Sequence, residues 1–584
     1  MAEDVTPRKE ASHKEALPPA GPAGIVGIGR ARKIRLVVLL CILAGSLGGY
    51  LLLRSSLARK ERERHEALTT ALTELRGDLN GLDPSASSKD LGERFAHAVA
   101  LWQNVQQLDP GNRDADRLGV ALWYAAGRYA DALTLFNALD VKQIRAEVDK
   151  EANRKATQAL DPFPILQADA VDAEIGRGGE GYLRRCGLLW GLGRTIAPAT
   201  ASDKEKALQL CRWMALHLLP EPLGDLPADP YIVAWRGYGS PAELAWTYAE
   251  LARQMSLCSE VVVPASAGAQ NGREYLVQVY IGEGKTILVN PRLGAPLIDP
   301  ASGEPLSLTA LADRPDAYRS LAASGSSGSA YQADMFKAVE LKTALDPPAC
   351  YPRFLVFEHL LSVLPVHPHV AFASTGLPAD RQVDLWEAPI DILHSMDSRG
   401  YAERVEKAYA ALALISDART THLSGAYDVA GELYGSSLAN LKNAMPKAEV
   451  KEASAVFSEA VEAASFFAAV NAYDSGDGPR AEKQLRDYVA QYPSGRWRTL
   501  AALILGEVLT AAGDKAGAED LWRGLPDARR LYVTLRSKGL MPEAVSWERG
   551  VKAAPPAARQ PAVEGQAAGA MPGAAARPPG APSP

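Results

Sequence analysis

The sequence has 584 residues, 47% of them hydrophobic and 23% charged, so most of it can build ordinary globular cores in about three to five domains. Its 63 basic and 69 acidic residues give a net charge of −6, which argues against a dedicated nucleic-acid binder because such proteins carry a basic excess. Five cysteines, with no Cys-x-x-Cys pair and no Cys/His cluster, exclude a disulfide framework and indicate no structural zinc.

The N-terminal region contains a predicted membrane anchor. Residues 1–33 and 550–584 are rich in Pro, Gly or Ala and are predicted to be disordered tails. Within residues 34–54, the stretch from Leu36 to Leu53 carries no charge and spans about 27 Å as a helix, enough to cross the hydrocarbon of a membrane. A cleaved signal peptide is the alternative, but the apolar run is long for one and no cleavage site follows it.

The orientation of this anchor is predicted from its position, because basic residues flank it on both sides. A short N-terminal tail before a long globular body usually stays in the cytoplasm. We therefore expect a single-pass inner-membrane protein whose bulk faces the periplasm or the exterior.

The chain after the anchor is predicted to be helical. Charged residues and spaced leucines over residues 55–90 indicate a helical stalk. Residues 91–160 are predicted to form helical hairpins, because small and aromatic residues recur there at spacings that resemble a tetratricopeptide repeat. In such a repeat small residues let antiparallel helices approach closely, and aromatic side chains fill the groove between them. The residues that carry the pattern are Trp123, Gly127, Tyr129, Ala132 and Phe136.

A second and stronger repeat occupies residues 399–535. Gly476 and Gly513 are separated by 37 residues, as are Ala481 and Ala518, so one helix–turn–helix unit occurs twice. The alternative is a generic helical bundle. Arrays of this kind bind extended peptides or partner proteins, although the sequence names no ligand.

The central residues 163–300 combine helices with a β-hairpin. Helices are expected over Tyr182–Ile196 and Lys204–Leu219, followed by a loop, a further helix and a strand. From Glu274 to Asn290, apolar and polar residues alternate on the first side of a Gly-Glu-Gly turn and an apolar run returns on the other. This is the pattern of a β-hairpin.

This order of elements resembles the transglutaminase-like core, a papain-like cysteine-enzyme fold. In that family an alanine follows the nucleophile by four residues and an arginine by twelve, and a proline follows the catalytic acid at the end of the hairpin. The residues that match the helix, strand and hairpin patterns are Ala245, Arg253, Leu276, Gln278, Val279 and Pro291. The resemblance implies an α+β core between the two helical arrays.

The catalytic positions of that family do not carry its chemistry in this chain. The resemblance places the nucleophile at Pro241, the base at Glu274 and the acid at Asn290. Cysteine-type catalysis needs a thiolate at a helix N-terminus with an imidazole beside it. Proline has no nucleophilic group, and glutamate cannot pair with a thiolate as a cation. The resemblance therefore implies a degenerate enzyme without catalytic residues, cofactor or metal.

The residues around Pro241 predict what replaces the nucleophile. Ser240 and Glu243 form a capping box with proline at the first helical position, so each side chain is expected to accept a hydrogen bond from the other residue's N–H. Ser240 has no histidine in a motif beside it to serve as a base, which argues against a substitute nucleophile. Cys258, at the start of a strand, is expected to be structural, like the cysteines of two predicted helices.

Two patterns that resemble ligand sites are interpreted as structural. The Gly-x-Gly-x-x-Gly pattern from Gly176 to Gly181 lacks the preceding strand of a dinucleotide site and is interpreted as a loop before the next helix. His367 and His369 flank a proline, with no third ligand at a suitable spacing, and are interpreted as a turn rather than a metal site. They lie within residues 301–398, which are predicted to form a small α/β or helical module.

The chain also resembles a wider set of bacterial membrane proteins that pair this core with helical repeats, and in which the Cys and His are often absent. The segments that carry this resemblance are Arg236–Gly239, Leu251–Gln254, Val289–Gly294 and Leu385–Pro389. We therefore expect a mixed fold, in which an N-terminal transmembrane helix precedes tetratricopeptide-like helical arrays on either side of an α+β transglutaminase-like core.

The expected function is that of a non-catalytic scaffold or peptide-binding protein of the bacterial cell envelope. Its expected partners are the membrane, through residues 36–53, and proteins or peptides, through the helical repeats; the oligomeric state is left open, with a stalk-driven oligomer as a third hypothesis. The alternative is an active cysteine-type amidase, protease or transamidase with a different catalytic arrangement. That alternative requires a Cys and a His within hydrogen-bond reach.

Overall fold

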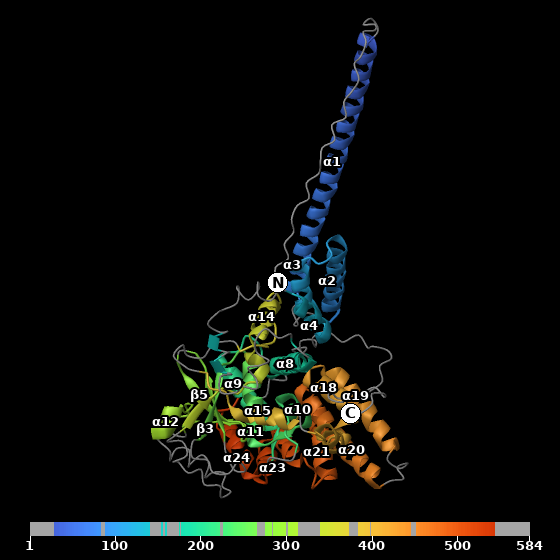
Figure 1. Cartoon of the computed structure of the whole chain (residues 1–584). Helices are drawn as coiled ribbons and strands as arrows, with labels where there is room; N and C mark the ends of the chain where they lie inside the picture. The colour runs from blue at the N-terminus through green and yellow to red at the C-terminus, as the bar shows by residue number, and fades with distance from the viewer. Residues whose placement is uncertain are drawn as a thin grey trace, which may run out of the picture. The chain divides into compact units, whose positions relative to one another are not determined.

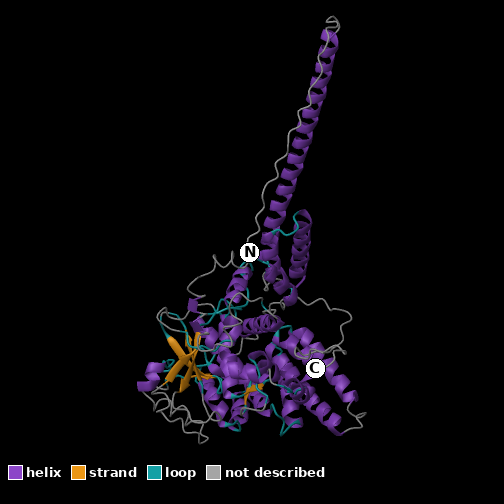
Figure 2. Ribbon diagram, viewed as in Figure 1, coloured by secondary structure: helices purple, strands orange, loops and turns teal. Residues whose placement is uncertain are grey.

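The computed structural model contains two compact units, residues 1–70 and residues 71–584. It is mostly helical with a small antiparallel sheet, and the strands gather at one side of the larger unit (Figures 1 and 2). Apart from residues 28–33, both predicted tails lie outside the described residues. The structure describes residues 28–82, 88–139, 154–155, 158–159, 175, 177–221, 226–264, 275–282, 284–299, 302–313, 339–372, 383–396, 399–444 and 451–542.

Helix α1 (Ile28–Asn80) runs through the segment of the predicted anchor and most of that of the predicted stalk. In the described part of the chain, no helix combines the length and the apolar character that a membrane crossing requires. The predicted anchor comprises residues 36–53. The structure describes the side chain of only the last of these residues, so the anchor stays a prediction. Beyond it the surface of α1 is charged, with Arg59 Nε 2.8 Å from Glu63 Oε1 one helical turn away.

The first predicted hairpin is present as a pair of antiparallel helices. The helices of this region are α2 (Ser88–Leu108), α3 (Arg113–Ala125) and α4 (Tyr129–Ala138). Asn112 caps α3, since its side-chain oxygen accepts from the Ala115 N–H at 3.0 Å. Ala132 and Phe136 are fully buried, and the Phe136 ring packs edge-on against Phe357 of a later helix.

Helix α11 is the central element of the larger unit. It packs against four other helices and against three strands, and nearly all of its residues are buried. The four helices of this centre are α8 (Arg177–Ile196), α9 (Asp203–His217), α10 (Pro230–Arg236) and α11 (Pro241–Gln254). Three of them begin at a side chain that accepts a backbone N–H: Ser202, Asp229 and Ser240.

The start of α8 corrects one interpretation. The stretch predicted to be a loop, Gly176–Gly181, is helical from Arg177 onward. A β-carbon on Gly179 would lie 2.0 Å from the Ile175 side chain, so glycine there permits close packing. Gly178, Gly179 and Gly181 therefore lie within a helix and not in the predicted loop, whereas Gly176 lies outside the described residues.

The predicted hairpin is confirmed as part of a five-stranded antiparallel sheet of order β6-β5-β4-β3-β7. In the hairpin Tyr280 pairs with Thr286 and Val277 with Val289. The strands are β3 (Ser259–Pro264), β4 (Leu276–Tyr280), β5 (Thr286–Asn290), β6 (Ala295–Pro296) and β7 (Val339–Lys342). A separate parallel pair joins β1 (Leu219–Pro220) to β2 (Tyr238–Gly239), just before α11.

Part of the segment 301–398 joins the central sheet. Its strand β7 pairs with β3 and so completes the sheet, with Val262 opposite Leu341. The sequence analysis did not predict β7, because this strand is only four residues long and its partner, β3, lies about 80 residues earlier in the chain. The other elements of the segment are α12 (Leu308–Asp313), the 3₁₀ helix Pro347–Cys350, α14 (Pro352–Leu361) and α15 (Glu387–Met396).

The C-terminal part is an array of antiparallel helices. Its elements are α16 (Tyr401–Ala408), α17 (Ala410–Ala413), α18 (Ser416–Leu423), α19 (Tyr427–Ala444), α20 (Lys451–Asp474), α21 (Gly478–Gln491), α22 (Arg498–Ala511), α23 (Lys515–Arg523) and α24 (Asp527–Ser537). From α18 to α23 each helix contacts the next along the chain. The array also joins the central core, because α22 contacts α9 and α24 contacts β6.

The 37-residue repeat corresponds to one local structure that occurs twice. Gly476 and Gly513 have φ of +81° and +89°, a conformation that suits glycine, and each is followed by an aspartate that caps the next helix. Ala481 and Ala518 are buried at the matching positions. The sequence repeat therefore predicts both turns of the array correctly.

Candidate functional site

The start of α11 is where the sequence resemblance places a nucleophile. The predicted capping box is confirmed: the Ser240 N–H donates to Glu243 Oε2 at 2.7 Å, and the Glu243 N–H donates to Ser240 Oγ at 3.3 Å. Pro241 is the first residue of the helix. Both capping side chains are buried, with exposed fractions of 2% each.

Glu243 has a second role that the sequence did not predict. Its carboxylate also accepts from the Ala228 N–H at 2.6 Å and from Arg236 Nη2 at 2.8 Å. Arg236 is buried as well, and it donates further to the Tyr409 hydroxyl at 2.7 Å and to the Tyr238 carbonyl at 2.8 Å. The helix start is therefore a buried ion pair with several additional hydrogen bonds, which is a structural arrangement.

Of the other two positions that the resemblance assigns, the structure describes only Asn290. Asn290 ends β5, is fully buried, and its Oδ1 accepts from the Leu293 N–H at 3.2 Å, so it holds the following turn. Glu274 lies outside the described residues. Ser240 Oγ accepts from a backbone N–H as a cap does, and the structure places a glutamate rather than a histidine beside it.

Cys258 has the properties of a structural thiol. Burial, with a further contribution from the charge of Glu260, raises the pKa of Cys258 to about 12. Burial likewise raises the pKa values of Cys186, Cys211 and Cys350 to about 12. Within the described part of the chain, Cys258 makes no side-chain hydrogen bond to a histidine, so the pairing that the cysteine-enzyme alternative requires is not formed there.

We expect iodoacetamide at pH 7.5 to alkylate Cys258 at least about 100-fold more slowly than it alkylates free N-acetylcysteine. A pKa near 12 leaves a thiolate fraction orders of magnitude below that of a free thiol, and the thiolate is the reactive species. Mass spectrometry of the folded protein measures the rate, with Cys258→Ala as the blank. Alkylation as fast as that of the free thiol would contradict the raised pKa of Cys258, and faster alkylation would show that the thiol is activated.

The other end of α11 holds a serine in an unusual backbone conformation. Ser256 follows the last helical turn with φ of +61°, and within the described residues it is the one non-glycine residue with positive φ. The Ser256 N–H donates to the Arg253 carbonyl at 2.9 Å and the Leu257 N–H to the Ala252 carbonyl at 2.8 Å, as in a Schellman motif. Glycine normally occupies this position, because a side chain there costs about 1 kcal/mol.

Ser256, His369 and Glu358 form a chain of hydrogen bonds. Ser256 Oγ lies 2.9 Å from His369 Nε2, and His369 Nδ1 lies 3.1 Å from Glu358 Oε1. The other carboxylate oxygen, Glu358 Oε2, accepts the N–H groups of Val370 and Ala371 at 2.8 and 2.6 Å. Because the carboxylate only accepts, Nδ1 carries the ring hydrogen and Nε2 is left to accept from the serine hydroxyl.

The carboxylate of this chain stays ionised. Burial acts to raise the pKa of Glu358, but the hydrogen bond and charge of His369, the Ala371 N–H and the charge of Arg253 together lower it below its ordinary value. The backbone of His369 is also fixed: the Gln254 side chain accepts from its N–H at 3.1 Å and donates to its carbonyl at 2.8 Å, and Arg253 donates to the same carbonyl. Arg253, a residue of the family pattern, thus helps to hold the histidine loop.

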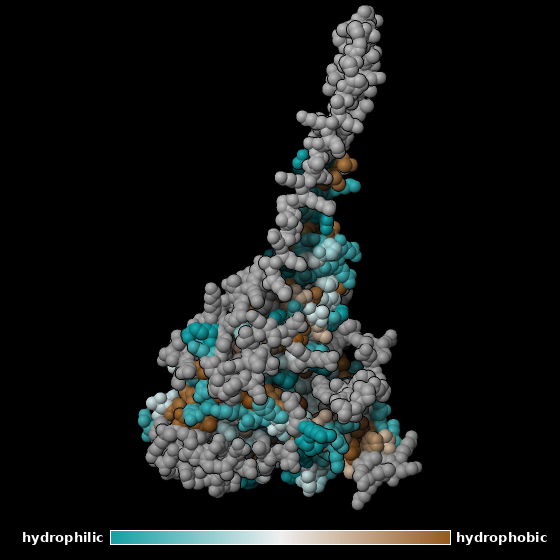
Figure 3. All heavy atoms as spheres, viewed as in Figure 1, coloured by the Kyte–Doolittle hydropathy of each residue, from teal (hydrophilic) through white to brown (hydrophobic). Residues whose placement is uncertain are grey.

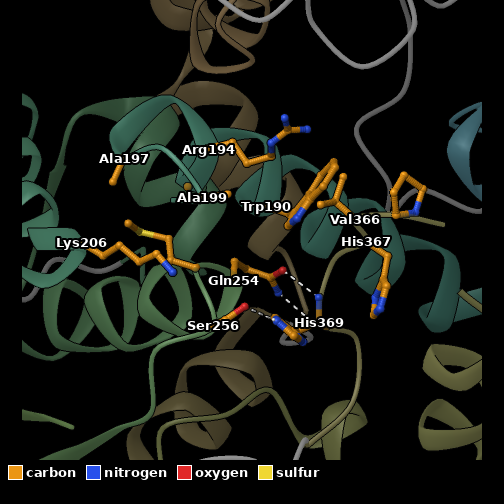
Figure 4. A pocket seen from close by; sticks show the side chains of 13 residues that line it. Trp190, Arg194, Ala197, Ala199, Lys206, Gln254, Ser256, Val366, His367 and His369 are labelled. Carbon is orange, nitrogen blue, oxygen red and sulfur yellow. Dashed lines mark hydrogen bonds between the residues drawn. The ribbon is translucent and has the colours of Figure 1, made fainter. Parts of the chain in front are cut away.

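A cavity of about 270 Å³ opens beside this chain of hydrogen bonds. It lies between α8, the start of α9, the end of α11 and the segment 365–369, and Ser256 and His369 point toward one another on its wall (Figure 4). Its lining includes Trp190, Arg194, Lys206 and Gln254. In Figure 4 the ammonium end of Lys206 is directed toward the middle of the cavity, whereas Arg194 is turned away from Ser256.

The sequence interpretation of this region was incomplete. The turn lies just before these histidines, at residues 362–366, and His369 faces Ser256 and Glu358. The three residues span 113 positions of the chain, so no local motif reveals them. The available signal was a serine in place of glycine just after a helix, followed by Leu257 and a strand.

A second histidine cluster joins the central core to the C-terminal array. Asp474, at the end of α20, lies 2.9 Å from His217 Nε2 on α9 and 2.8 Å from His422 Nε2 on α18. The second ring nitrogen of His217 contacts the Trp213 carbonyl at 2.9 Å, so both of its partners are acceptors. The second nitrogen of His422 faces the donor Arg419 Nη1 at 3.2 Å, so His422 donates only to Asp474 and is neutral.

We expect the free energy of unfolding to fall by about 3 kcal/mol as the pH drops from 6.5 to 4, because of His422. Burial lowers the pKa of His422 to about 4, despite the opposing effect of Asp474. Between pH 4 and 6.5 the unfolded chain therefore binds a proton that the folded chain does not, and acidification favours unfolding. Urea midpoints across this range measure the slope, and His422→Gln should flatten it; an equal slope in the variant would assign it to other groups.

Comparison of the chain with models of known protein families, with curated proteins and with solved structures gives no match.

Proposed function

We propose that the protein is a membrane-anchored scaffold of the bacterial cell envelope, which binds proteins or peptides and is non-catalytic at its transglutaminase-like position. The observation that carries this proposal is the buried Arg236–Glu243 ion pair and capping box at the start of α11. An enzyme of the family needs that helix start open to substrate and occupied by a thiolate. In this chain the side chains of Arg236, Ser240 and Glu243 at that helix start hold the helix in place instead.

The helical array supports the binding part of the proposal. Its hairpins pack on one another and on the central core, so they present a fixed surface built from successive repeats. The transglutaminase-like and tetratricopeptide-like assignments belong to the same proposal and rest on the sequence patterns. No observation in the described part of the chain favours the cysteine-type enzyme over it.

Two exposed leucines support the anchor. Leu53 and Leu57 on α1 are 62% and 58% exposed; Leu53 is the last residue of the uncharged stretch and Leu57 lies one helical turn beyond it. Figure 3 shows hydrophobic atoms on α1 where the coloured part of that helix begins. Large apolar side chains at this position are stabilised at a membrane interface and are unfavourable in water.

Fractionation of cells tests the anchor. The full chain is expected to remain with the membrane pellet in alkaline carbonate and to be released by detergent, whereas a chain lacking residues 1–53 is expected in the supernatant. Release of the full chain by carbonate alone would contradict the anchor, because carbonate strips proteins that are held by charge.

Photo-crosslinking tests the scaffold. A benzophenone amino acid is placed at Lys483 or Arg523, both exposed on the array, and at Lys204, exposed on α9, as the matched control. We expect a discrete adduct of one mass from the array positions and none from the control. Absence of an adduct from every exposed array position would contradict a binding role for the array.

A further inference from the structure

We propose that Ser256 is the nucleophile of an ester-hydrolysing site at the C-terminal end of α11, with His369 as its general base and Glu358 as the carboxylate that orients the histidine. This proposal goes beyond the scaffold function and does not rest on it. It places acyl-transfer chemistry at the opposite end of the helix from the position that the family uses.

The geometry meets the requirements for an activated serine. The hydroxyl lies 2.9 Å from the nitrogen that accepts its proton, and the carboxylate lies 3.1 Å from the other ring nitrogen. Two backbone N–H groups fix Glu358, and Gln254 and Arg253 fix the backbone of His369. The base is therefore held in one orientation and one tautomer before substrate binds.

The backbone of Ser256 supplies an independent argument. The helix end needs a residue with positive φ, and glycine meets that need without strain. The hydrogen bonds of the helix end use the backbone of Ser256 and not its hydroxyl. The chain thus has a strained serine where the fold requires only a glycine, and its exposed hydroxyl faces the histidine.

The cavity defines the class of substrate. Its volume of about 270 Å³ suits a small acyl ester rather than an extended peptide. Trp190, Met255 and Val366 offer apolar contacts for the acyl chain, and Lys206, which also lines the cavity, supplies positive charge that can stabilise negative charge on the carbonyl oxygen.

The reaction proceeds in two balanced steps. Ser256 Oγ attacks the carbonyl carbon while its proton passes to His369 Nε2; the bond from carbonyl carbon to alkoxy oxygen then breaks, and His369 gives the proton to the leaving alcohol. Water next attacks the acyl-serine as His369 takes a proton from it. The carbon–Oγ bond breaks, Ser256 regains its proton from His369, and the carboxylic acid leaves and loses its proton to solvent.

The test is covalent labelling of the full chain in detergent with an alkyl fluorophosphonate. Ser256 Oγ would attack phosphorus, fluoride would leave, and His369 would take the serine proton. We expect mass spectrometry to locate the label on Ser256, and labelling to be at least about 100-fold slower in His369→Gln and in Glu358→Gln. Ser362→Ala, which removes an exposed serine at the end of α14, should leave the rate unchanged.

Ser256→Gly separates chemistry from folding. It should abolish labelling while the thermal midpoint stays equal or rises, because glycine relieves the backbone strain. Hydrolysis of p-nitrophenyl butyrate should disappear in Ser256→Gly and persist in Cys258→Ala, so this result is independent of the scaffold proposal. An unlabelled Ser256 in folded protein, with a known serine hydrolase labelled alongside, would overturn the proposal, as would label on other serines only.

Discussion

Replacing Glu243 by alanine is expected to lower the free energy of unfolding by about 3–5 kcal/mol. The substitution removes the acceptor of three donors at once: the N–H groups of Ala228 and Ser240 and the guanidinium of Arg236. Arg236 is only 4% exposed, so its charge stays buried without a counter-ion. Loss of the helix cap adds about 1 kcal/mol to this effect. Urea unfolding followed by tryptophan fluorescence measures the change.

The chain offers a matched control for this prediction at the start of α9. Ser202 and Glu205 form the same capping box, with the same 3.3 Å bond from the glutamate N–H to the serine oxygen, but they are exposed and, among the described residues, have no arginine partner. Glu205→Ala is therefore expected to change the urea midpoint far less than Glu243→Ala. Equal shifts in the two variants would show that Glu243 acts as a cap alone and that the buried ion pair contributes nothing.

Replacing Asp474 by alanine is expected to lower the free energy of unfolding by about 3–5 kcal/mol. The carboxylate accepts from His217 and His422, whose side chains are 4% and 2% exposed, and both would lose their acceptor inside the protein. Although burial acts to raise the pKa of Asp474, the two histidines hold it well below its ordinary value, so the carboxylate is ionised and the loss includes a charge interaction. Thermal and urea midpoints measure the effect.

Two variants test this prediction. Asp474→Asn keeps the shape of the side chain but supplies one acceptor oxygen in place of two, so an intermediate loss is expected. Asp487→Ala removes an exposed aspartate of the same array, whose partner is Lys483 at 3.0 Å, and should change stability by less than about 0.5 kcal/mol. If Asp474→Ala also changed the free energy of unfolding by less than about 0.5 kcal/mol, the array would not be held to the core through this cluster.

Local sequence rules predict the parts of the fold whose causes are local. The capping box at Ser240 and Glu243 depends on residues three apart, and the β4–β5 hairpin depends on alternation around one turn. The 37-residue repeat predicts both Gly-Asp turns of the array because each repeat sets its own turn. In each case the residues that cause the structure lie within one short window.

The sequence does not predict features whose partners meet only in the folded chain. Arg236 completes the helix start of α11 by contacts with Tyr409, which lies 173 residues later. Strand β7 joins the sheet from a segment predicted to be a separate module, and His369 meets Ser256 across 113 residues. The interpretation of Gly176–Gly181 as a loop was wrong for a different reason. Gly179 lies in a helix, where the lack of a side chain lets it pack closely against Ile175.

The central claim is that the start of α11, where the sequence resemblance places a nucleophile, is a structural helix start, and we propose that it carries no cysteine chemistry. Amide hydrolysis and glutamine–lysine transfer by the full chain in detergent test it most directly, measured beside Cys258→Ala and an active transglutaminase. The account predicts no turnover that depends on Cys258 while the control enzyme is active. Turnover by the wild-type chain that disappears in Cys258→Ala would contradict it and identify the protein as a cysteine enzyme.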